Sequence, residues 1–342
     1  MDLRYAPETK QIGTGGRVIA SQLPANSAEF HKIDRIAELN LDALNIYDRY
    51  RGHPQLSNTA HQRLFKHELV SAVESGGACS TISSKHEIVA ACAIKPLSWD
   101  TQHFGLSMAK LSLAAASGCP ASALNNLLRD TLRVANQKDN SLHISCEVDI
   151  DDYLCLNTLL DLGAEILDIK REYRWTSLKG IKAPKFLSQV REYDSHDKPK
   201  VMQLAVHNNF ESRFSRDTHL AAAKTRKLYQ IWLEKLLDGN EANRIALVIE
   251  KNGRVQACGA IEQQDLNYAG VDVQTMSNGI YISSPDAIGS YYPIIYSLAE
   301  HALARFDSVQ TCVSLNNRSA SRVLERMNTG AESTRYALRL KL

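Results

Sequence analysis

The sequence contains no run of about 18 apolar residues and no apolar stretch near its start, the patterns that a membrane-spanning helix and a secretory signal require. It also lacks an excess of one charge, because 40 basic and 38 acidic residues leave a net charge of only +2. Such a balance provides no basic field for a nucleic acid or an anionic membrane. We therefore expect a soluble, cytoplasmic protein that binds neither nucleic acid nor membrane.

Paired cysteine patterns are absent as well. The seven cysteines are odd in number and never form a C-x-x-C pair, and the eleven histidines do not stand at ligand spacing from one another or from a cysteine pair. The pattern disfavours zinc, and we expect no metal. Most of the cysteines lie in apolar runs such as VAACAI, which predicts buried free thiols in a reducing compartment.

The chain is long enough for about two domains, since 342 residues exceed a typical single domain about twofold. Three short similarities recur in the same order at separations of 164 to 167 residues: Arg49-Tyr50 with Arg213-Phe214, Ala91-Cys92 with Ala257-Cys258, and Gly163-Ala164-Glu165 with Gly330-Ala331-Glu332. This common spacing predicts a tandem duplication. We place the junction in the Gly- and Pro-containing stretch from Lys179 to Lys185, which gives copies at residues 1–180 and 186–342.

Hydrophobic periodicity predicts the same series of elements in both copies. In the first copy we expect helices near 28–48 and 58–75, strands at 78–83, 88–97 and 107–114, a helix at 121–136, a strand at 141–148, a helix at 151–161 and a strand ending near 175. In the second copy we expect a strand at 190–194, helices at 196–208 and 220–238, strands at 244–251, 254–264 and 278–284, a helix at 293–306, a strand at 308–315, a helix at 319–327 and a terminal strand. Each copy therefore has an α/β pattern, with a mixed, mostly antiparallel sheet flanked by helices.

This order of elements resembles that of the GNAT N-acyltransferase superfamily, and shorter motifs resemble the TDP-fucosamine acetyltransferases within it. The motifs span about residues 97–342 and are Leu97-Ser98-Trp99-Asp100-Thr101-Gln102-His103-Phe104-Gly105, Leu159-Leu160-Asp161-Leu162-Gly163-Ala164, Ser212-Arg213-Phe214, the run Leu228 to Glu234, and Glu332-Ser333-Thr334-x-Tyr336. The resemblance implies that a primary amine, with an amino sugar or sugar nucleotide as the leading acceptor, attacks an acyl-CoA thioester directly within a ternary complex. It also implies that the second copy performs the transfer and that the first is degenerate.

The phosphate-binding loop departs from the family pattern (Gln/Arg)-x-x-Gly-x-(Gly/Ala). The corresponding residues run from Asp286 to Tyr291, and only Gly289 fits. Asp286 brings a negative charge toward a diphosphate, and Tyr291 replaces a residue whose small size lets phosphate approach the backbone. The corresponding loop of the first copy, residues 116–121, fits no better. The loop leaves three alternatives open, namely acetyl-CoA or another acyl-CoA as donor, an acyl carrier protein as donor, or a catalytically inactive scaffold.

The resemblance assigns candidate residues for each step. For the thioester donor these are Ile282, Ser283, Ile288, Gly289, Ser290, Tyr291 and Asn317, and for the acceptor Arg213, Phe214 and Arg216. Glu262, at the end of a strand, is the candidate base. The tyrosine that serves the family as an acid falls on Leu324, so Tyr281, Tyr291 and Tyr292 are the substitute acids.

Alternative roles are open for several of these residues. Asn317 can cap a helix without any ligand, and Glu262 can be a solvated residue at a sheet edge. Trp99 and Phe104 are interpreted as core anchors, with stacking on a base or sugar as the alternative. A homodimer is compatible with the sequence.

Overall fold

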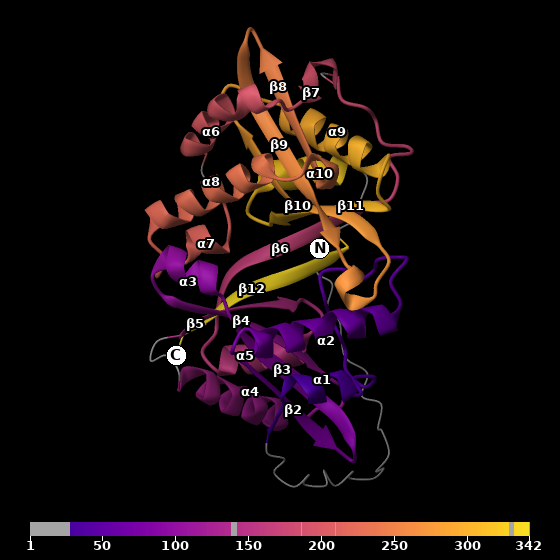
Figure 1. Ribbon diagram of the computed structural model, residues 1–342, viewed down its shortest axis with the longest axis vertical. Helices are drawn as coiled ribbons and strands as arrows, with labels where there is room; N and C mark the ends of the chain where they lie inside the picture. Colours follow the sequence, from indigo (N-terminus) through magenta and orange to yellow (C-terminus); the bar gives the residue numbers. More distant parts are fainter. Residues whose placement is uncertain (1–27, 138–141, 186, 209, 328–331, 342) are drawn as a thin grey trace, which may run out of the picture.

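The fold is described from a computed structural model, which defines residues 28–137, 142–185, 187–208, 210–327 and 332–341 (Figure 1). The first half contains β1 (Glu29–Phe30), α1 (Ile33–Glu38), α2 (Asn58–Glu74), β2 (Ala78–Ser84), β3 (Glu87–Pro96), α3 (Ser98–Phe104), β4 (Ser107–Ala115), α4 (Ala121–Asn136), β5 (Leu142–Asp149), α5 (Tyr153–Asp161) and β6 (Glu165–Trp175). The second half contains β7 (Val190–Glu192), α6 (Lys198–His207), α7 (Arg213–Arg216), α8 (Ala222–Asp238), β8 (Arg244–Lys251), β9 (Arg254–Asp265), β10 (Gln274–Ser283), α9 (Tyr291–Leu303), β11 (Ser308–Ser314), α10 (Arg318–Arg326) and β12 (Ser333–Lys341).

The predicted series of elements is confirmed in both halves, with one helix that was predicted too long and two that were not predicted. The helix expected at 28–48 is present only as α1. Before it, Glu29–Phe30 form strand β1, which was not predicted, and after it turns and bends follow, with Gly52 in a left-handed conformation. The short helices α3 and α7 were not predicted as helices. Of the similar segments that led to the duplication, Gly330-Ala331 lies outside the described residues.

All twelve strands form one continuous sheet with the order β1-β2-β3-β4-β5-β12-β6-β11-β10-β9-β8-β7. Read from either end, this order is the same series of equivalent strands. The register agrees, because Lys341 pairs with His143 while Trp175 pairs with Val309, and each residue is 166 positions from its equivalent. The structure therefore confirms two copies of one unit, related by an approximate twofold axis at the centre of the sheet.

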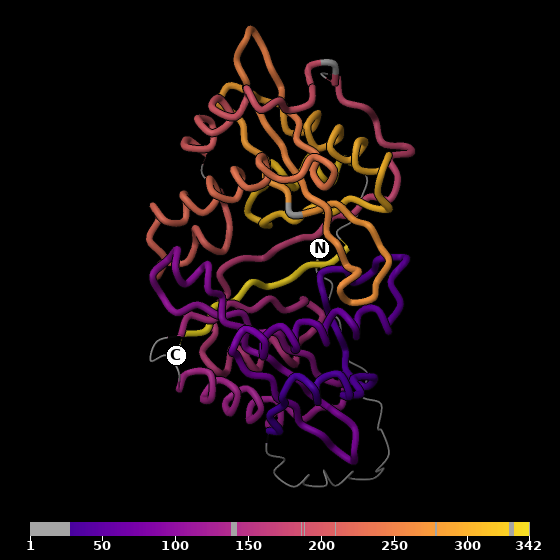
Figure 2. The backbone as a smooth tube through the Cα atoms, viewed as in Figure 1, coloured from indigo at the N-terminus to yellow at the C-terminus, as the bar shows by residue number. Residues whose placement is uncertain are grey.

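The two halves exchange their last strands. β6 of the first half pairs with β11 of the second, and β12 of the second half pairs with β5 of the first. The two exchanged strands also pair with each other along the middle of the molecule, where Figure 2 shows them side by side. The sequence does not predict this exchange, which joins the two expected sheets into one.

Helices cover both faces of the sheet. In the second half, α9 and α10 pack on one face around Ile294 and Leu324, and α6 and α8 pack on the other around Leu233. The first half repeats this arrangement, with α4 and α5 on one face and α2 on the other. Within the described chain, no helix is long and apolar enough to cross a bilayer.

A buried ionic cluster ties the first half to the segment between α7 and α8. Asp217 lies 2.6 Å from Nε2 of His143 on β5 and accepts a hydrogen bond of 2.6 Å from Arg339 on β12. The Asp217 side chain is only 1% exposed. Burial alone would raise the pKa of Asp217, but the hydrogen bonds from His143, the His219 amide and Arg339 outweigh it and lower this pKa to about 2.

We expect the lowered pKa of Asp217 to make the stability of the folded protein depend on pH in the acidic range. Because the folded pKa of about 2 lies below the ordinary value of 3.8, Asp217 contributes stability above pH ~4 that is lost as the pH falls toward 2, about 2 kcal/mol in total. The Asp217→Asn variant should lose this part of the pH dependence of the unfolding free energy, measured by urea denaturation between pH 5 and 2.5. Asp130→Asn, which changes an exposed acid paired with Arg133, is the control. Equal pH dependence in Asp217→Asn and the unsubstituted protein would contradict the assignment.

Candidate functional site

Strands β10 and β11 are parallel and separate soon after they meet. They pair only at Thr275 with Ser308 and at Met276 with Val309. Beyond this point β10 continues to pair with β9 and β11 with β6, and β10 carries a register irregularity between Ser277 and Ile280. The facing edges of β10 and β11 therefore leave backbone amide and carbonyl groups available to an extended ligand between them.

A cavity of about 340 Å³ occupies this separation, and we call it the strand cleft. It passes from the α9 and α10 face of the sheet, where Ala299 and Asn317 line it, to the α7 and α8 face, where Phe214 and Trp232 line it. Its lining is mostly apolar, which suits the narrow chain of a thioester arm.

A second cavity, of about 650 Å³, lies over the centre of the sheet, and we call it the central cavity. Its walls come from both halves, including α2, α3 and β4 of the first half and α7 and α8 of the second. The two cavities share six lining residues, which are Lys170, Arg213, Trp232, Gly279, Gln310 and Cys312. A molecule in the strand cleft can therefore meet a molecule in the central cavity at these residues.

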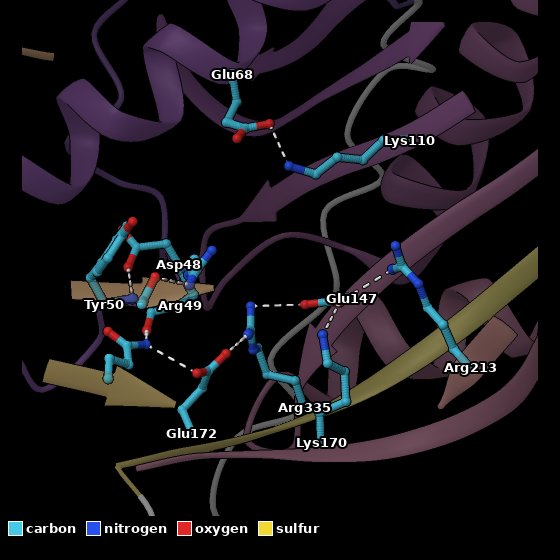
Figure 3. A network of polar contacts seen from close by, with 12 residues as sticks. Asp48, Arg49, Tyr50, Glu68, Lys110, Glu147, Lys170, Glu172, Arg213 and Arg335 are labelled. Atoms are coloured by element: carbon cyan, nitrogen blue, oxygen red, sulfur yellow. Dashed lines mark hydrogen bonds and ion pairs between the residues drawn. The ribbon is translucent and has the colours of Figure 1, made fainter. Parts of the chain in front are cut away.

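Glu147 on β5 is the centre of an ionic network on the floor of the central cavity (Figure 3). Its carboxylate accepts a hydrogen bond of 2.7 Å from Lys170 and one of 3.2 Å from Arg213, and it pairs with Arg335 at 3.0 Å. Burial alone would raise the pKa of Glu147, but Lys170, Arg335 and Arg213 hold it well below its ordinary value. Glu147 is therefore a weak base, and its three cationic partners make it a poor proton acceptor for a reaction.

The network continues to the first half through Glu172 on β6. Glu172 pairs with Arg335 and accepts a hydrogen bond of 3.1 Å from Gln310, whose amide also donates to the backbone carbonyl of Arg49 at 2.9 Å. Arg49 in turn donates to the Ser277 hydroxyl at 3.0 Å. These contacts fix the strand positions around the point where β10 and β11 separate.

Of the proposed acids, the structure brings two into the strand cleft. Tyr281 and Tyr291 line it, with their rings 4.5 Å apart. The Tyr281 hydroxyl lies 2.6 Å from Ser290 Oγ, which itself donates to the carbonyl of Ala287, so Tyr281 is the donor to Ser290. Tyr292 is not brought there, because its hydroxyl donates to the carbonyl of Lys182 at the outer side of α9.

Glu262 is half-buried on β9, between Ala260, which lines the strand cleft, and Gln264, which lines the central cavity. Alternate residues of a strand share a face, so Glu262 faces the side on which the two cavities meet. Its assignment as a base stays a prediction.

The residues predicted for the donor are divided between cleft, core and surface. Tyr291 and Asn317 line the strand cleft, and Asn317 also caps α10 by accepting a hydrogen bond from the Ala320 amide. Ile282 is fully buried against α6 and α8, and the Ser283 backbone is hydrogen-bonded to Asn208. Ser290 packs against Tyr281. Ile288 and Gly289 are exposed on the loop before α9.

The acceptor residues predicted on α7 have different environments. Arg213 lines both cavities, and its guanidinium lies 4.7 Å from the centre of the Phe214 ring, which lines the strand cleft. Arg216 lines neither cavity and pairs with Glu211. Near this helix Phe104 is buried, as predicted, and packs on Phe214. The prediction for Trp99 was wrong, because its side chain is 40% exposed and stacks on His103, one helical turn later in α3.

The cysteine prediction holds for six residues and fails for Cys312, which opens into both cavities. Desolvation by the surrounding protein, opposed by Lys170, raises the pKa of the Cys312 thiol. Cys312 is therefore protonated at neutral pH and is a poor nucleophile. No group of three or more metal-binding side chains occurs among the described residues.

The equivalent cleft of the first half is closed. β4 and β5 stay paired over five residues, from Ser107 with Leu142 to Leu111 with Cys146. Beyond these pairs, the backbone amide of Asn45 donates a hydrogen bond to the Ala115 carbonyl. The Asn45 side chain donates another to Ser117, in the loop that corresponds to the phosphate-binding loop. The first half thus fills its own cleft and contributes to the central cavity instead.

Sequence reasoning missed the charged residues on the floor of the central cavity: Glu147, Lys170, Glu172 and Arg335. Lys170 and Glu172 belong to one strand, but Glu147 and Arg335 come from two others, and the four form no motif. Glu147 stands among apolar residues of β5, which is a signal that could have identified it, since charges are rarely buried without a partner. Strand β6, which carries Lys170 and Glu172, is rich in charged residues and gives no such signal.

A GCN5-related N-acetyltransferase from Sphaerobacter thermophilus superposes with a TM-score of 0.53, at 11% identity and over 81% of this chain and 85% of that one. This chain has the GNAT fold. A tandem GNAT protein from the clavulanic acid biosynthesis pathway is 11% identical with a TM-score of 0.48, over 81% of this chain and 87% of that one. A GNAT-family acetyltransferase from Colwellia psychrerythraea is also 11% identical, with a TM-score of 0.46 over 92% and 99% of the two chains.

The GNAT assignment rests on the first of these structures and concerns the fold alone. No protein-family model matches the chain, and no curated protein has significant similarity to it. The comparisons give no support to the narrower resemblance to the TDP-fucosamine acetyltransferases.

Proposed function

We propose that this protein is an N-acyltransferase that moves an acetyl or other acyl group from coenzyme A to a primary amine. The observation that carries the proposal is the meeting of the strand cleft and the central cavity at the point where β10 and β11 separate. The cleft holds the thioester arm of acyl-CoA, and the central cavity holds the amine. The second half supplies the cleft, and both halves supply the acceptor cavity.

The reaction is a direct attack. The amine nitrogen bonds to the thioester carbonyl carbon, the oxyanion accepts a hydrogen bond from the free backbone edge of β10, and the C–S bond breaks. Glu262, directly or through water, takes the proton that the nitrogen loses. Tyr281 gives a proton to the departing thiolate. Burial raises the pKa of Tyr281, so its hydroxyl is protonated at neutral pH, and it turns from its hydrogen bond with Ser290 to donate to the thiolate in this step.

The Tyr281→Phe variant, which lacks the hydroxyl, is expected to have a kcat about 100-fold lower, with little change in the KM for acetyl-CoA, since general acid catalysis contributes roughly that factor. The measurement is release of free thiol from acetyl-CoA in the presence of an amine. Tyr292→Phe, which removes a hydroxyl outside the cleft, is the matched control. Equal rates for the two variants would exclude Tyr281 as the acid.

Binding of acetyl-CoA, measured by calorimetry, tests the function independently of the acceptor. The resemblance of residues 97–342 to sugar-nucleotide acetyltransferases makes an amino sugar or a sugar nucleotide one candidate acceptor. TDP-linked amino sugars therefore belong among the first amines to test. Failure to bind any acyl-CoA and to transfer an acyl group would contradict the proposal and favour a scaffold role.

A carrier protein as donor is favoured by one further observation. Arg318, Arg322 and Arg326 follow one another at four-residue intervals on α10, and all three are exposed without an ion pair to any described residue. This row begins next to Asn317 at the strand cleft and fits an acidic protein surface. Such a donor has no adenosine diphosphate, which agrees with the altered loop before α9. Transfer from acetyl carrier protein but not from acetyl-CoA would establish this alternative.

A further inference from the structure

We propose that the acceptor carries a carboxylate next to its primary amine, as an amino acid does, and that Arg213 and Asp100, on two neighbouring helices that line the central cavity, bind these two groups. The inference rests on the proposed function and narrows its substrate class. It also gives the first half a role, because Asp100 lies on α3 of the first half, whereas Arg213 lies on α7 of the second half.

The charges around the central cavity balance. Five cationic side chains line it, which are Arg49, Lys110, Lys170, Arg213 and Arg335, and five acidic ones, which are Asp48, Glu68, Asp100, Glu147 and Glu172. A sugar-nucleotide diphosphate would bring about two negative charges into this balanced site without matching cations. A zwitterion adds no net charge and can pair at both ends.

The Arg213 side chain is held in place, but not all of its hydrogen-bond donors are used. One nitrogen of its guanidinium donates to Glu147, and the Phe214 ring packs against the group. Among the described residues it has no other ion-pair partner, and its side chain is 26% exposed at the meeting point of the two cavities. Its remaining N–H donors have the fork geometry that binds a carboxylate with two hydrogen bonds.

Asp100 is the acidic counterpart on the neighbouring helix α3, whose Phe104 packs on Phe214 of α7. It lines the central cavity in the first turn of α3, and no described side chain donates a hydrogen bond to it or forms an ion pair with it. Burial raises its pKa, and Arg213 is near enough to oppose that shift. Two opposite charges that face one cavity without contact leave space for a ligand bearing both charges, because Glu147 and Phe214 hold Arg213 back.

The acceptor preference can be tested with matched compounds. The unsubstituted protein, with acetyl-CoA as donor, is assayed against the common L-amino acids, TDP-linked amino sugars, and the amide and decarboxylated amine of the best amino acid. We expect the free carboxylate to be preferred over the amide by about 10- to 100-fold in kcat/KM, the usual range for a charge-assisted hydrogen bond. Equal use of the amide, or preference for the TDP-linked sugar, would overturn the inference while leaving the N-acyltransferase function in place.

Variants then assign the preference to Arg213. Arg213→Met should remove the preference for the carboxylate, and Arg213→Lys, which keeps the charge without the fork, should retain part of it. Arg226→Met, which changes an exposed arginine of α8 that lines neither cavity, should keep the full preference. An undiminished preference in a folded Arg213→Met protein would also overturn the inference. Binding of acetyl-CoA with no transfer to any amine would overturn both the inference and the proposed function.

Discussion

Replacing Cys312 with tryptophan is expected to reduce acyl transfer at least about 100-fold, since displacing reacting groups by about 1 Å can cost that factor. Cys312 opens into both cavities from the middle of β11, so the larger ring extends into the space where thioester and amine meet. The measurement is thiol release from acetyl-CoA, with circular dichroism to verify folding. A Cys312→Trp protein that is folded and fully active would show that the reaction occurs elsewhere.

The Cys312→Ser variant distinguishes steric obstruction of the site from a chemical role of the thiol. In a direct transfer the thiol forms no covalent intermediate, so this near-isosteric variant should keep its rate within about tenfold of the unsubstituted protein, far above the tryptophan variant. Trapping of an acyl group on Cys312, detected by mass spectrometry of the intact protein, would contradict direct attack.

Replacing Glu147 with alanine is expected to lower the free energy of unfolding by about 2 to 3 kcal/mol, because its ion pairs are half-buried and the effect lies between about 1 kcal/mol for exposed pairs and about 3 to 5 kcal/mol for buried ones. The change leaves Lys170 and Arg213 without their carboxylate and removes one of the two acidic partners of Arg335. Urea denaturation at neutral pH measures the effect.

The matched control is Glu325→Ala, which breaks an exposed pair with Arg171. Exposed pairs contribute at most about 1 kcal/mol, so this variant should differ little from the unsubstituted protein. Comparable losses in the two variants would mean that the network around Glu147 does not hold the halves together.

The secondary structure was predictable because it depends on local periodicity. The helix predicted at 121–136 coincides with α4, and the hairpin between β8 and β9 turns at Asn252 and Gly253, both at positive φ. The equivalent turn of the first half has Lys85 and His86 at positive φ without a glycine, so no turn motif marks it. The local sequence pattern was therefore sufficient to predict most helices and strands.

The site was only partly predictable because it depends on long-range pairing. Tyr291 and Tyr292 are adjacent, but successive residues of a helix point in directions about 100° apart, so only the first faces the cleft. The separation of β10 and β11 follows from the family order of strands. The partners of Glu147 come from β6, α7 and β12, and no sequence pattern brings these segments together.

The exchange of β6 and β12 has a consequence for biosynthesis. β5 ends at Asp149, but its neighbour β12 begins only at Ser333, near the end of the chain. During translation the first half therefore exposes the open edge of β5 until nearly all of the second half has left the ribosome, and such an edge is prone to wrong pairing. Truncation before β12 should leave both halves incomplete, so neither half is expected to fold as a separate module.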